Sequence, residues 1–182
     1  MPTPSKVRVY IACSLDGFIA GRGDDLSWLS DVLETEDKTD DGVVEFEQFL
    51  SGVGALLMGR RTFDVVTSFA GELPYGEIPL LIATNRPLER PNPNVRPVHG
   101  TISEMIDEAR KVAAGKDIYV DGASLIRQAL DAGEVDDLII TVAPHVLGEG
   151  TSLFSGVSQR HRLVFTGHYR YGAMLQIHAR PI

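Results

Sequence analysis

The chain alternates short apolar runs with stretches whose apolar positions recur at helical spacing. Residues 7–12 are β-branched and aromatic and predict a first strand. Further strands are predicted at residues 55–58, 79–84, 95–98, 117–120 and 137–142. The segments with the period of amphipathic helices are residues 43–51, 61–68, 101–115 and 123–132. Thr101 followed by Glu104 predicts a capping box at the start of the third helix.

Two segments depart from this alternation. Residues 162–170 and 173–180 alternate apolar and polar positions around Tyr171-Gly172, which predicts an antiparallel pair of strands. Residues 21–41 are polar and end in an acid-rich stretch, which predicts a long solvated loop. Alternating strands and helices followed by paired strands indicate an α/β domain whose parallel sheet carries antiparallel strands at one edge. No linker divides residues 1–182, so we expect one domain.

Composition narrows the class of protein. With 43% hydrophobic and 23% charged residues, the chain is typical of globular proteins in water. The net charge of −8 disfavours a nucleic-acid surface, which needs a clustered basic face. No run of about 18 apolar residues predicts a membrane span, and the N-terminus lacks a signal-peptide core, so we expect a cytoplasmic protein. One cysteine and five scattered histidines argue against a metal site.

Two glycine turns each follow a predicted strand and precede a predicted helix. Gly59-Arg60-Arg61-Thr62 follows the second strand, and Gly122-Ala123-Ser124-Leu125 follows the fifth. Free backbone N–H groups at a helix N-terminus bind anions, and guanidinium groups suit phosphate oxygens. Either turn alone is an ordinary strand–helix connection. Because both fall at carboxyl ends of strands, where such sheets bind ligands, the pair predicts a phosphorylated cofactor with two anionic parts.

Five motifs occur in an order that is typical of one superfamily. They are an "SLDG" turn within residues 11–20, "MGRxT" at 58–62, and segments 84–86, 120–125 and 144–154, the last similar to "PVxLGxGxxLF". The chain thereby resembles the dihydrofolate reductase-like superfamily, most closely the reductase domain of bifunctional riboflavin-biosynthesis proteins and its stand-alone relatives. The resemblance implies a three-layer α/β/α fold, with a mixed, mostly parallel sheet and a C-terminal antiparallel hairpin. It also implies an NADPH-dependent reductase of a small pyrimidine- or pterin-like heterocycle, similar to 5-amino-6-(5-phosphoribosylamino)uracil reductase.

The resemblance further implies which residues bind NADPH. Those implied for the adenosine 2′-phosphate are Arg60, Thr84, Asn85 and Arg86. Those implied for the pyrophosphate are Arg61, Thr62, Gly122, Ala123, Ser124 and Leu125, and Gly59 is implied for cofactor binding as part of the first turn. Those implied for the nicotinamide are Ala12 and Ile19. Relatives of this type commonly pair, which implies a homodimer through the terminal strands and residues 147–154.

Reduction by a nicotinamide also needs a proton for the substrate, and two carboxylates are candidates. Glu45 lies in the region that matches the acid-bearing helix of dihydrofolate reductases; its alternative role is a solvated helix glutamate. Asp16 lies in the "SLDG" turn; its alternative role is a turn former. Trp28 lies where the fold carries a substrate-covering loop. It would either stack on a flat substrate ring or pin that loop to the core.

Two departures from the family bear on the substrate. The chain lacks the motifs of a zinc deaminase, so only a reduction step is expected. Arg22 and Lys38 are the only cations between residues 14 and 50, which disfavours a phosphorylated substrate. Two other functions stay open. One is a non-catalytic NADPH-binding or sensing module, because no proton donor stands out, and the other is a true dihydrofolate reductase.

Overall fold

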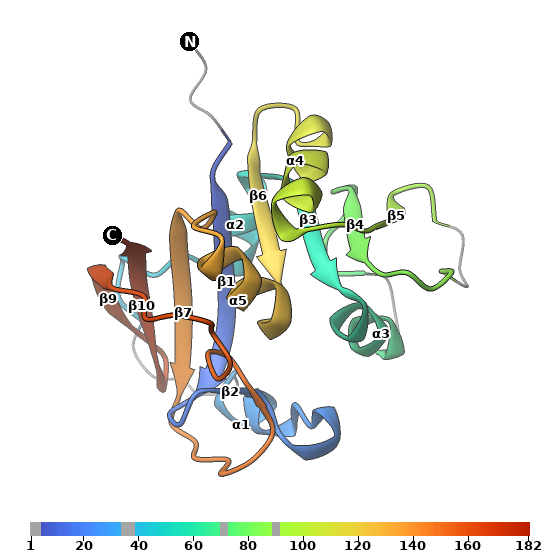
Figure 1. Cartoon of the computed structure of the whole chain (residues 1–182). Coiled ribbons are helices and arrows are strands. Elements are labelled where there is room, and N and C mark those ends of the chain that lie inside the picture. Colours follow the sequence, from blue (N-terminus) through green and yellow to red (C-terminus); the bar gives the residue numbers. More distant parts are fainter. Residues whose placement is uncertain (1–4, 34–38, 70–72, 89–91) are drawn as a thin grey trace.

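A computed structural model of the chain describes residues 5–33, 39–69, 73–88 and 92–182 (Figure 1). The strands of the main sheet are β1 Val7–Ser14, β3 Val53–Gly59, β4 Leu80–Ala83, β5 Val95–Val98, β6 Asp117–Asp121, β7 Asp137–Ala143, β9 Leu163–Tyr171 and β10 Met174–Pro181. Their order across the sheet is β5-β4-β3-β6-β1-β7-β10-β9. Neighbours from β5 to β7 pair in parallel, whereas β10 is antiparallel to both β7 and β9.

Helices cover both faces of the sheet. The helices α4 Ile102–Val112 and α5 Ala123–Asp131 lie on one face, in front of the strands in Figure 1. The helices α2 Phe46–Ser51 and α3 Arg60–Ser68 pack on the other face. A separate two-stranded sheet is formed by β2 Phe18–Ala20 and β8 Thr151–Ser152. The predicted three-layer α/β/α fold, with its mostly parallel sheet and antiparallel C-terminal strands, is confirmed.

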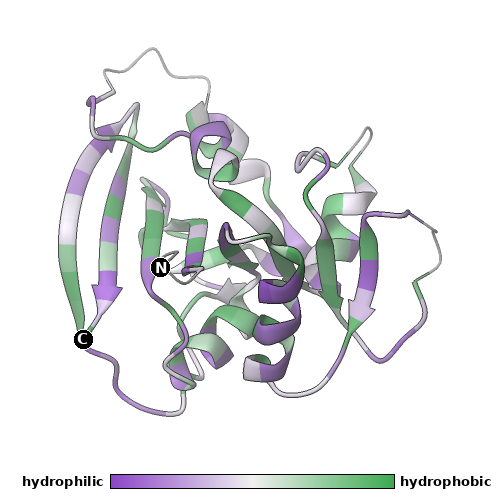
Figure 2. Ribbon diagram, turned by 90° about the horizontal axis from the view of Figure 1, so that it is seen from above, coloured by the Kyte–Doolittle hydropathy of each residue, from purple (hydrophilic) through white to green (hydrophobic). Residues whose placement is uncertain are grey.

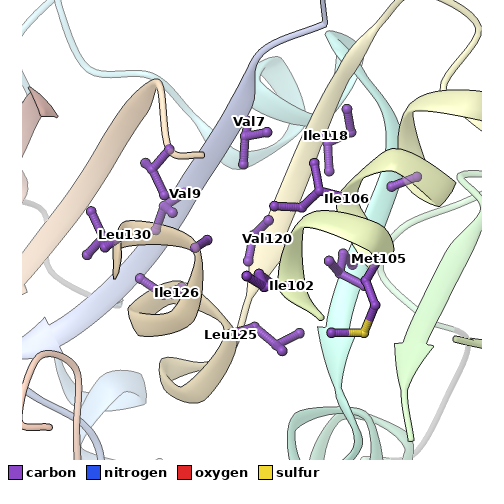
Figure 3. Packing of buried hydrophobic residues seen from close by; sticks show 14 of the residues in the cluster. Val7, Val9, Ile102, Met105, Ile106, Ile118, Val120, Leu125, Ile126 and Leu130 are labelled. Atoms are coloured by element: carbon purple, nitrogen blue, oxygen red, sulfur yellow. The ribbon is translucent and has the colours of Figure 1, made fainter. Parts of the chain in front are cut away.

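The central strands bury side chains on both faces, as parallel strands between two helix layers must. Figure 3 shows Val7 and Val120 on one face, packed beneath Ile106 of α4 and Ile126 of α5. Tyr119, the neighbour of Val120, belongs to the opposite core with the apolar side chains of α2 and α3. Strands that alternate between two cores read as continuous apolar runs. The apolar colour of the central strands in Figure 2 follows from this.

Most predicted elements are confirmed within one or two residues, including the capping box of Thr101 and Glu104. The helix predicted at residues 43–51 begins only at Phe46. Gln176, which is fully buried in β10, explains the difference. Its amide accepts a hydrogen bond from Val44 N–H (2.8 Å) and donates one to Val44 C=O (3.1 Å). The backbone of Val44 is therefore already bonded to a distant strand and does not continue the helix.

The prediction of a long solvated loop at residues 21–41 is wrong for most of its described part. A short 3-10 helix, η1, spans Arg22–Asp24, and α1 spans Ser27–Leu33. Trp28 and Val32 of α1 are buried against Ala143 and Met174, so this polar-looking segment contributes to the core. Residues 34–38 of the acid-rich stretch lie outside the described residues. Among the helices that the structure describes, none is both long enough and apolar enough to cross a membrane.

Candidate functional site

A cavity of about 780 Å³ opens at the carboxyl ends of the parallel strands. Its wall takes residues from the ends of β1, β3, β4, β5 and β6 and from the first turns of α3 and α5. This is the edge at which open α/β sheets bind ligands, because the strand order brings loops from several strands together there. Phe46 of α2 also lines the cavity, and the part of the wall around Phe46 is called the end beneath α2.

The two glycine turns lie next to each other on the wall of this cavity. Met58 and Asp121 are paired in register, so the glycines that follow them lie side by side. A Cβ on Gly122 would lie only 2.5 Å from Thr62 Oγ1, and the φ of Gly122 is +92°, which favours glycine. Neither α3 nor α5 has a side-chain cap. The backbone N–H groups of both first turns are therefore available to an anion at one place.

Arg60 is held in a fixed orientation at the side of the cavity. Its Nε donates to Asp64 Oδ1 (2.7 Å), and its Nη1 donates to the carbonyl of Pro87 (3.0 Å). The side chain is only 17% exposed. Arg86 Nη2 lies 3.8 Å from the other oxygen of Asp64, but Arg86 is largely exposed and does not line the cavity. A guanidinium fixed in this way can receive a phosphate without first losing side-chain freedom.

Arg61 pairs across the mouth of the cavity with Asp24 of η1. Its Nε lies 2.9 and 3.1 Å from the two Asp24 oxygens, and its Nη2 lies 2.8 Å from Oδ1. Both residues line the cavity. The guanidinium is 70% exposed, so the pair is weak in water and open to exchange with an anionic ligand. The segment preceding α1 thus reaches the first turn of α3 over the site.

The end of the cavity beneath α2 is aromatic and contains one buried acid. Tyr10, Phe46 and Tyr119 line it together with Asp121. Burial raises the pKa of Asp121 to about 6, although the hydrogen bond from Gly122 N–H favours its ionised form. A carboxyl group with this pKa carries a proton in a useful fraction of molecules near neutral pH and can give it up.

All but one of the residues predicted for the cofactor line this single cavity. They are Ala12, Ile19, Gly59, Arg60, Arg61, Thr62, Thr84, Asn85, Gly122, Ala123, Ser124 and Leu125. The exception is Arg86, whose position at the surface matches that of a solvated loop arginine. The structure brings the others together from five separate segments of the chain. Their role in binding a cofactor stays a prediction.

The contacts of Asp16 support its alternative role as a turn former. Its carboxylate accepts hydrogen bonds from Ser14 Oγ (2.6 Å), Gly148 N (2.7 Å) and Leu147 N (3.1 Å). The Ser14 hydroxyl, then the Gly148 N–H, lower the pKa of Asp16 to about 2. A carboxyl group with that pKa holds no proton at neutral pH, and Asp16 does not line the cavity. Its geometry is that of a clamp between two loops.

Glu45 and Trp28 also lie outside the cavity wall. Glu45 is exposed just before α2, where its carboxylate accepts a hydrogen bond from the Tyr171 hydroxyl. This contact ties α2 to the C-terminal hairpin. Trp28 is 4% exposed, and its indole N–H donates to the carbonyl of Asp25 (3.2 Å). Of the two roles that the sequence left open for Trp28, these contacts support pinning of the segment to the core.

The comparison with known families decides the assignment. Residues 73–177 match the RibD C-terminal domain. The chain belongs to this family. The RibD C-terminal domain is reductase-like, and its family supports a reductase of the riboflavin-pathway type.

Two individual proteins are similar to this RibD-type domain over nearly their whole length. It is 29% identical over 174 residues to the uncharacterized protein YwjB of Bacillus subtilis, covering 95% of this chain and 96% of that one. A protein of Shewanella sp. PV-4, provisionally described as a riboflavin biosynthesis protein, matches with a TM-score of 0.83 at 28% identity. That match covers 97% of this chain and 99% of the Shewanella chain.

Two more distant structures show the fold alone. The deaminase/5-amino-6-(5-phosphoribosylamino)uracil reductase of Thermotoga maritima has a TM-score of 0.69 at 15% identity, covering 98% of this chain and 57% of its own. Dihydrofolate reductase of Enterococcus faecalis, solved with NADP(H), has a TM-score of 0.59 at 18% identity, covering 97% and 96%. The resemblance to both groups is confirmed.

Sequence reasoning missed the acid that the RibD-type domain places in its cavity. Asp121 lies within the motif at residues 120–125, and its carboxyl group is not among the predicted proton donors. A signal was nevertheless present, because Asp121 is the single charge at the end of the apolar run Ile118-Tyr119-Val120. An acid in that position, directly before a glycine, lies at the strand end that faces ligands in such sheets. His99 and Arg127 also line the cavity and carry no comparable signal.

Proposed function

We propose that this chain is an NADPH-dependent reductase of a small heterocyclic substrate. The observation that carries the proposal is one continuous cavity with two chemically different ends. One end has an oriented arginine and two uncapped helix N-termini, and the other has aromatic walls and a buried carboxyl group. A dinucleotide with three phosphate groups matches the first end, and a flat reducible ring matches the second. Membership of a reductase-like family supports the same assignment.

The residues at the first end fit NADPH. Arg60 would contact the adenosine 2′-phosphate, which is absent from NADH. Arg61, Thr62 and the turn from Gly122 to Leu125 would hold the pyrophosphate. Exchange of the Asp24 carboxylate for a phosphate would leave Arg61 paired throughout. Bound NADPH would supply a hydride to the substrate at the second end of the cavity.

Asp121 would supply the proton that must accompany the hydride. It is the buried carboxyl group of the cavity wall, and its raised pKa keeps the protonated form accessible near neutral pH. For a carbon–nitrogen double bond, the carbon gains the hydride and the nitrogen gains the Asp121 proton while NADPH becomes NADP⁺. The non-catalytic sensing module was kept open because no proton donor stood out in the sequence. Asp121 is a candidate donor, so it weakens the case for that module.

The proposal is tested by titrating the purified chain with NADPH and with NADH and following nicotinamide emission. We expect micromolar binding and a clear preference for NADPH. A second step measures NADPH oxidation with a panel of pyrimidines, pterins and imines. Failure of both cofactors to bind at millimolar concentration would refute the proposal. Tight cofactor binding without turnover of any compound would favour the sensing module, and trimethoprim-sensitive reduction of dihydrofolate would favour a dihydrofolate reductase.

We also propose that two copies of the chain associate in the cytoplasm. Val164, Phe165 and Leu175 expose apolar side chains on β9 and β10 at the open edge of the sheet, and Phe165 is 71% exposed. An apolar sheet edge of this kind is usually covered by another chain. Light scattering should give twice the mass of the chain. Phe165→Asp should reduce it to the monomer mass, and a monomeric wild-type protein would refute the association.

A further inference from the structure

The second end of the cavity allows the substrate class to be narrowed. We propose that the substrate of this chain is a flat, nitrogen-containing ring that is neutral or cationic and carries no phosphate group. The inference rests on the proposed reductase function and concerns only the substrate end of its site. It sets this chain apart from the phosphorylated pyrimidine that appears in the name of the Thermotoga maritima reductase.

Three aromatic rings form the wall beneath α2. The ring of Phe46 lies 5.4 Å from that of Tyr10 and 6.5 Å from that of Tyr119, centroid to centroid. The hydroxyl of Tyr10 donates to Val44 C=O (3.0 Å), and that of Tyr119 donates to Tyr10 C=O (2.8 Å). Since both hydroxyl protons are already donated within the protein, these tyrosines offer ring surface more than hydrogen bonds. Such a wall suits a flat conjugated ring.

Aliphatic side chains from two further segments also line the cavity. Leu26 and Leu29 come from the segment of α1, and Val65 and Val66 come from α3; all four are half-buried and line the cavity. None of them can pair with a charged group. A ligand group placed here would leave water without gaining a polar partner, which is costly for an anion in particular.

The cations of the cavity wall are committed elsewhere. In the part of the chain that the structure describes, its arginines are Arg60, Arg61 and Arg127. Arg60 and Arg61 lie in the first turn of α3 and pair with Asp64 and Asp24. Arg127 lies on α5 and donates to the carbonyl of Ser152 (2.7 Å). A substrate phosphate would have to displace one of these contacts and also compete with the cofactor.

The acid of this wall that pairs with no arginine of the cavity is Asp121, because Asp24 is paired with Arg61. Asp121 follows Tyr119 and Val120 at the end of β6. A phosphate dianion beside the ionised Asp121 carboxylate would be repelled in a poorly hydrated site. A ring nitrogen or amino group, in contrast, can share a hydrogen bond with Asp121. The electrostatics of this end therefore select a nitrogen ring and reject its phosphate ester.

The test is a calorimetric titration of the chain saturated with NADP⁺. The ligands are 5-amino-6-ribosylaminouracil and its 5′-phosphate, which differ only in the phosphate. We expect the phosphate-free compound to bind at least about tenfold more tightly, the ratio that corresponds to about 1.4 kcal/mol. Leu26→Arg places a cation at this end, so it should reduce the ratio between the affinities of the phosphate-free compound and its 5′-phosphate. Phe46→Ala should weaken the phosphate-free ligand without changing NADP⁺ affinity, and Phe69→Ala is the matched control because Phe69 is exposed outside the cavity.

Equal or tighter binding of the 5′-phosphate would overturn the inference, and so would the absence of binding by both compounds. In either case the NADP⁺ titration in the same sample would still support the reductase. Loss of NADP⁺ binding itself would refute the proposed function, and the substrate class would fall with it. An unchanged ratio in Leu26→Arg would show that this end of the cavity does not hold the phosphate-bearing side of the ligand.

Discussion

Asp121→Asn should stabilise the protein at neutral pH and at the same time remove its activity. Burial raises the pKa of Asp121 from 3.8 to about 6. Between these pH values the folded state keeps a proton that the unfolded state has released. The free energy of unfolding therefore falls as the pH rises through this window and stays lower above it. A shift of about 2 pKa units corresponds to about 3 kcal/mol.

Asparagine has nearly the same shape as aspartate but does not ionise. Its side-chain oxygen can still accept the hydrogen bond from Gly122 N, which is 2.8 Å long in the wild-type protein. We therefore expect Asp121→Asn to unfold at a higher temperature than wild type at pH 7.5. About 3 kcal/mol corresponds to roughly 6–12 °C for a domain of this size. The two proteins should have similar stability near pH 4, where both carry an uncharged side chain.

The catalytic consequence has the opposite sign. Without a proton to donate, kcat/KM for the reduction should fall by about 10²–10⁴-fold. In wild type, kcat/KM should decline above pH 6 as Asp121 loses its proton, and this decline should be absent from the residual activity of the variant. NADPH affinity should change little, because the asparagine oxygen can still accept the hydrogen bond from Gly122 N in the second glycine turn.

Thermal unfolding followed by circular dichroism between pH 4 and 8, combined with initial rates of NADPH oxidation, measures both effects. Asp137→Asn is a suitable control, because Asp137 lies at the opposite end of the sheet in an ion pair with Lys6 (2.8 Å). A variant that is less stable than wild type at pH 7.5 would refute the burial argument. A variant that keeps wild-type turnover would show that the proton comes from another group.

Three further outcomes are expected. Arg60→Ala should weaken NADPH by about 10–100-fold and NADH much less, as followed by nicotinamide fluorescence; equal losses would mean that Arg60 does not contact the 2′-phosphate. Asp16→Asn should lower stability to urea at pH 7, because the lowered pKa of Asp16 makes its contribution present above pH 3.8 and lost as the pH falls through about 2. If the free energy of unfolding of Asp16→Asn fell at acid pH as steeply as that of wild type, Asp16 would not stabilise the protein in this way. Gly122→Ala should cost about 1–3 kcal/mol and impair NADPH binding, since its Cβ would lie 2.5 Å from Thr62 Oγ1; unimpaired binding in calorimetry would exclude the close approach of the two turns.

The amino-acid sequence determined the layers of this fold because the relevant signals are local. Apolar runs such as 55–58 and 118–120 are buried on both faces, so each reads as a strand without knowledge of its neighbours. The capping box of Thr101 and Glu104 is contained within four residues and was correctly predicted. The two glycine turns were found for the same reason, and the parallel pairing of β3 and β6 then placed them together.

Only the tertiary structure decided the roles of residues whose partners are distant in sequence. The segment of Trp28 reads as polar, yet Ala143 and Met174 bury its indole ring. Val44 has helical spacing, yet Gln176 of β10 takes its backbone hydrogen bonds. Two carboxyl groups, Asp16 and Asp121, look alike in the sequence. The Ser14 hydroxyl and loop N–H groups lower the pKa of Asp16 and keep it ionised, whereas burial raises the pKa of Asp121 to about 6. A pKa depends on surroundings that the chain assembles only when it folds.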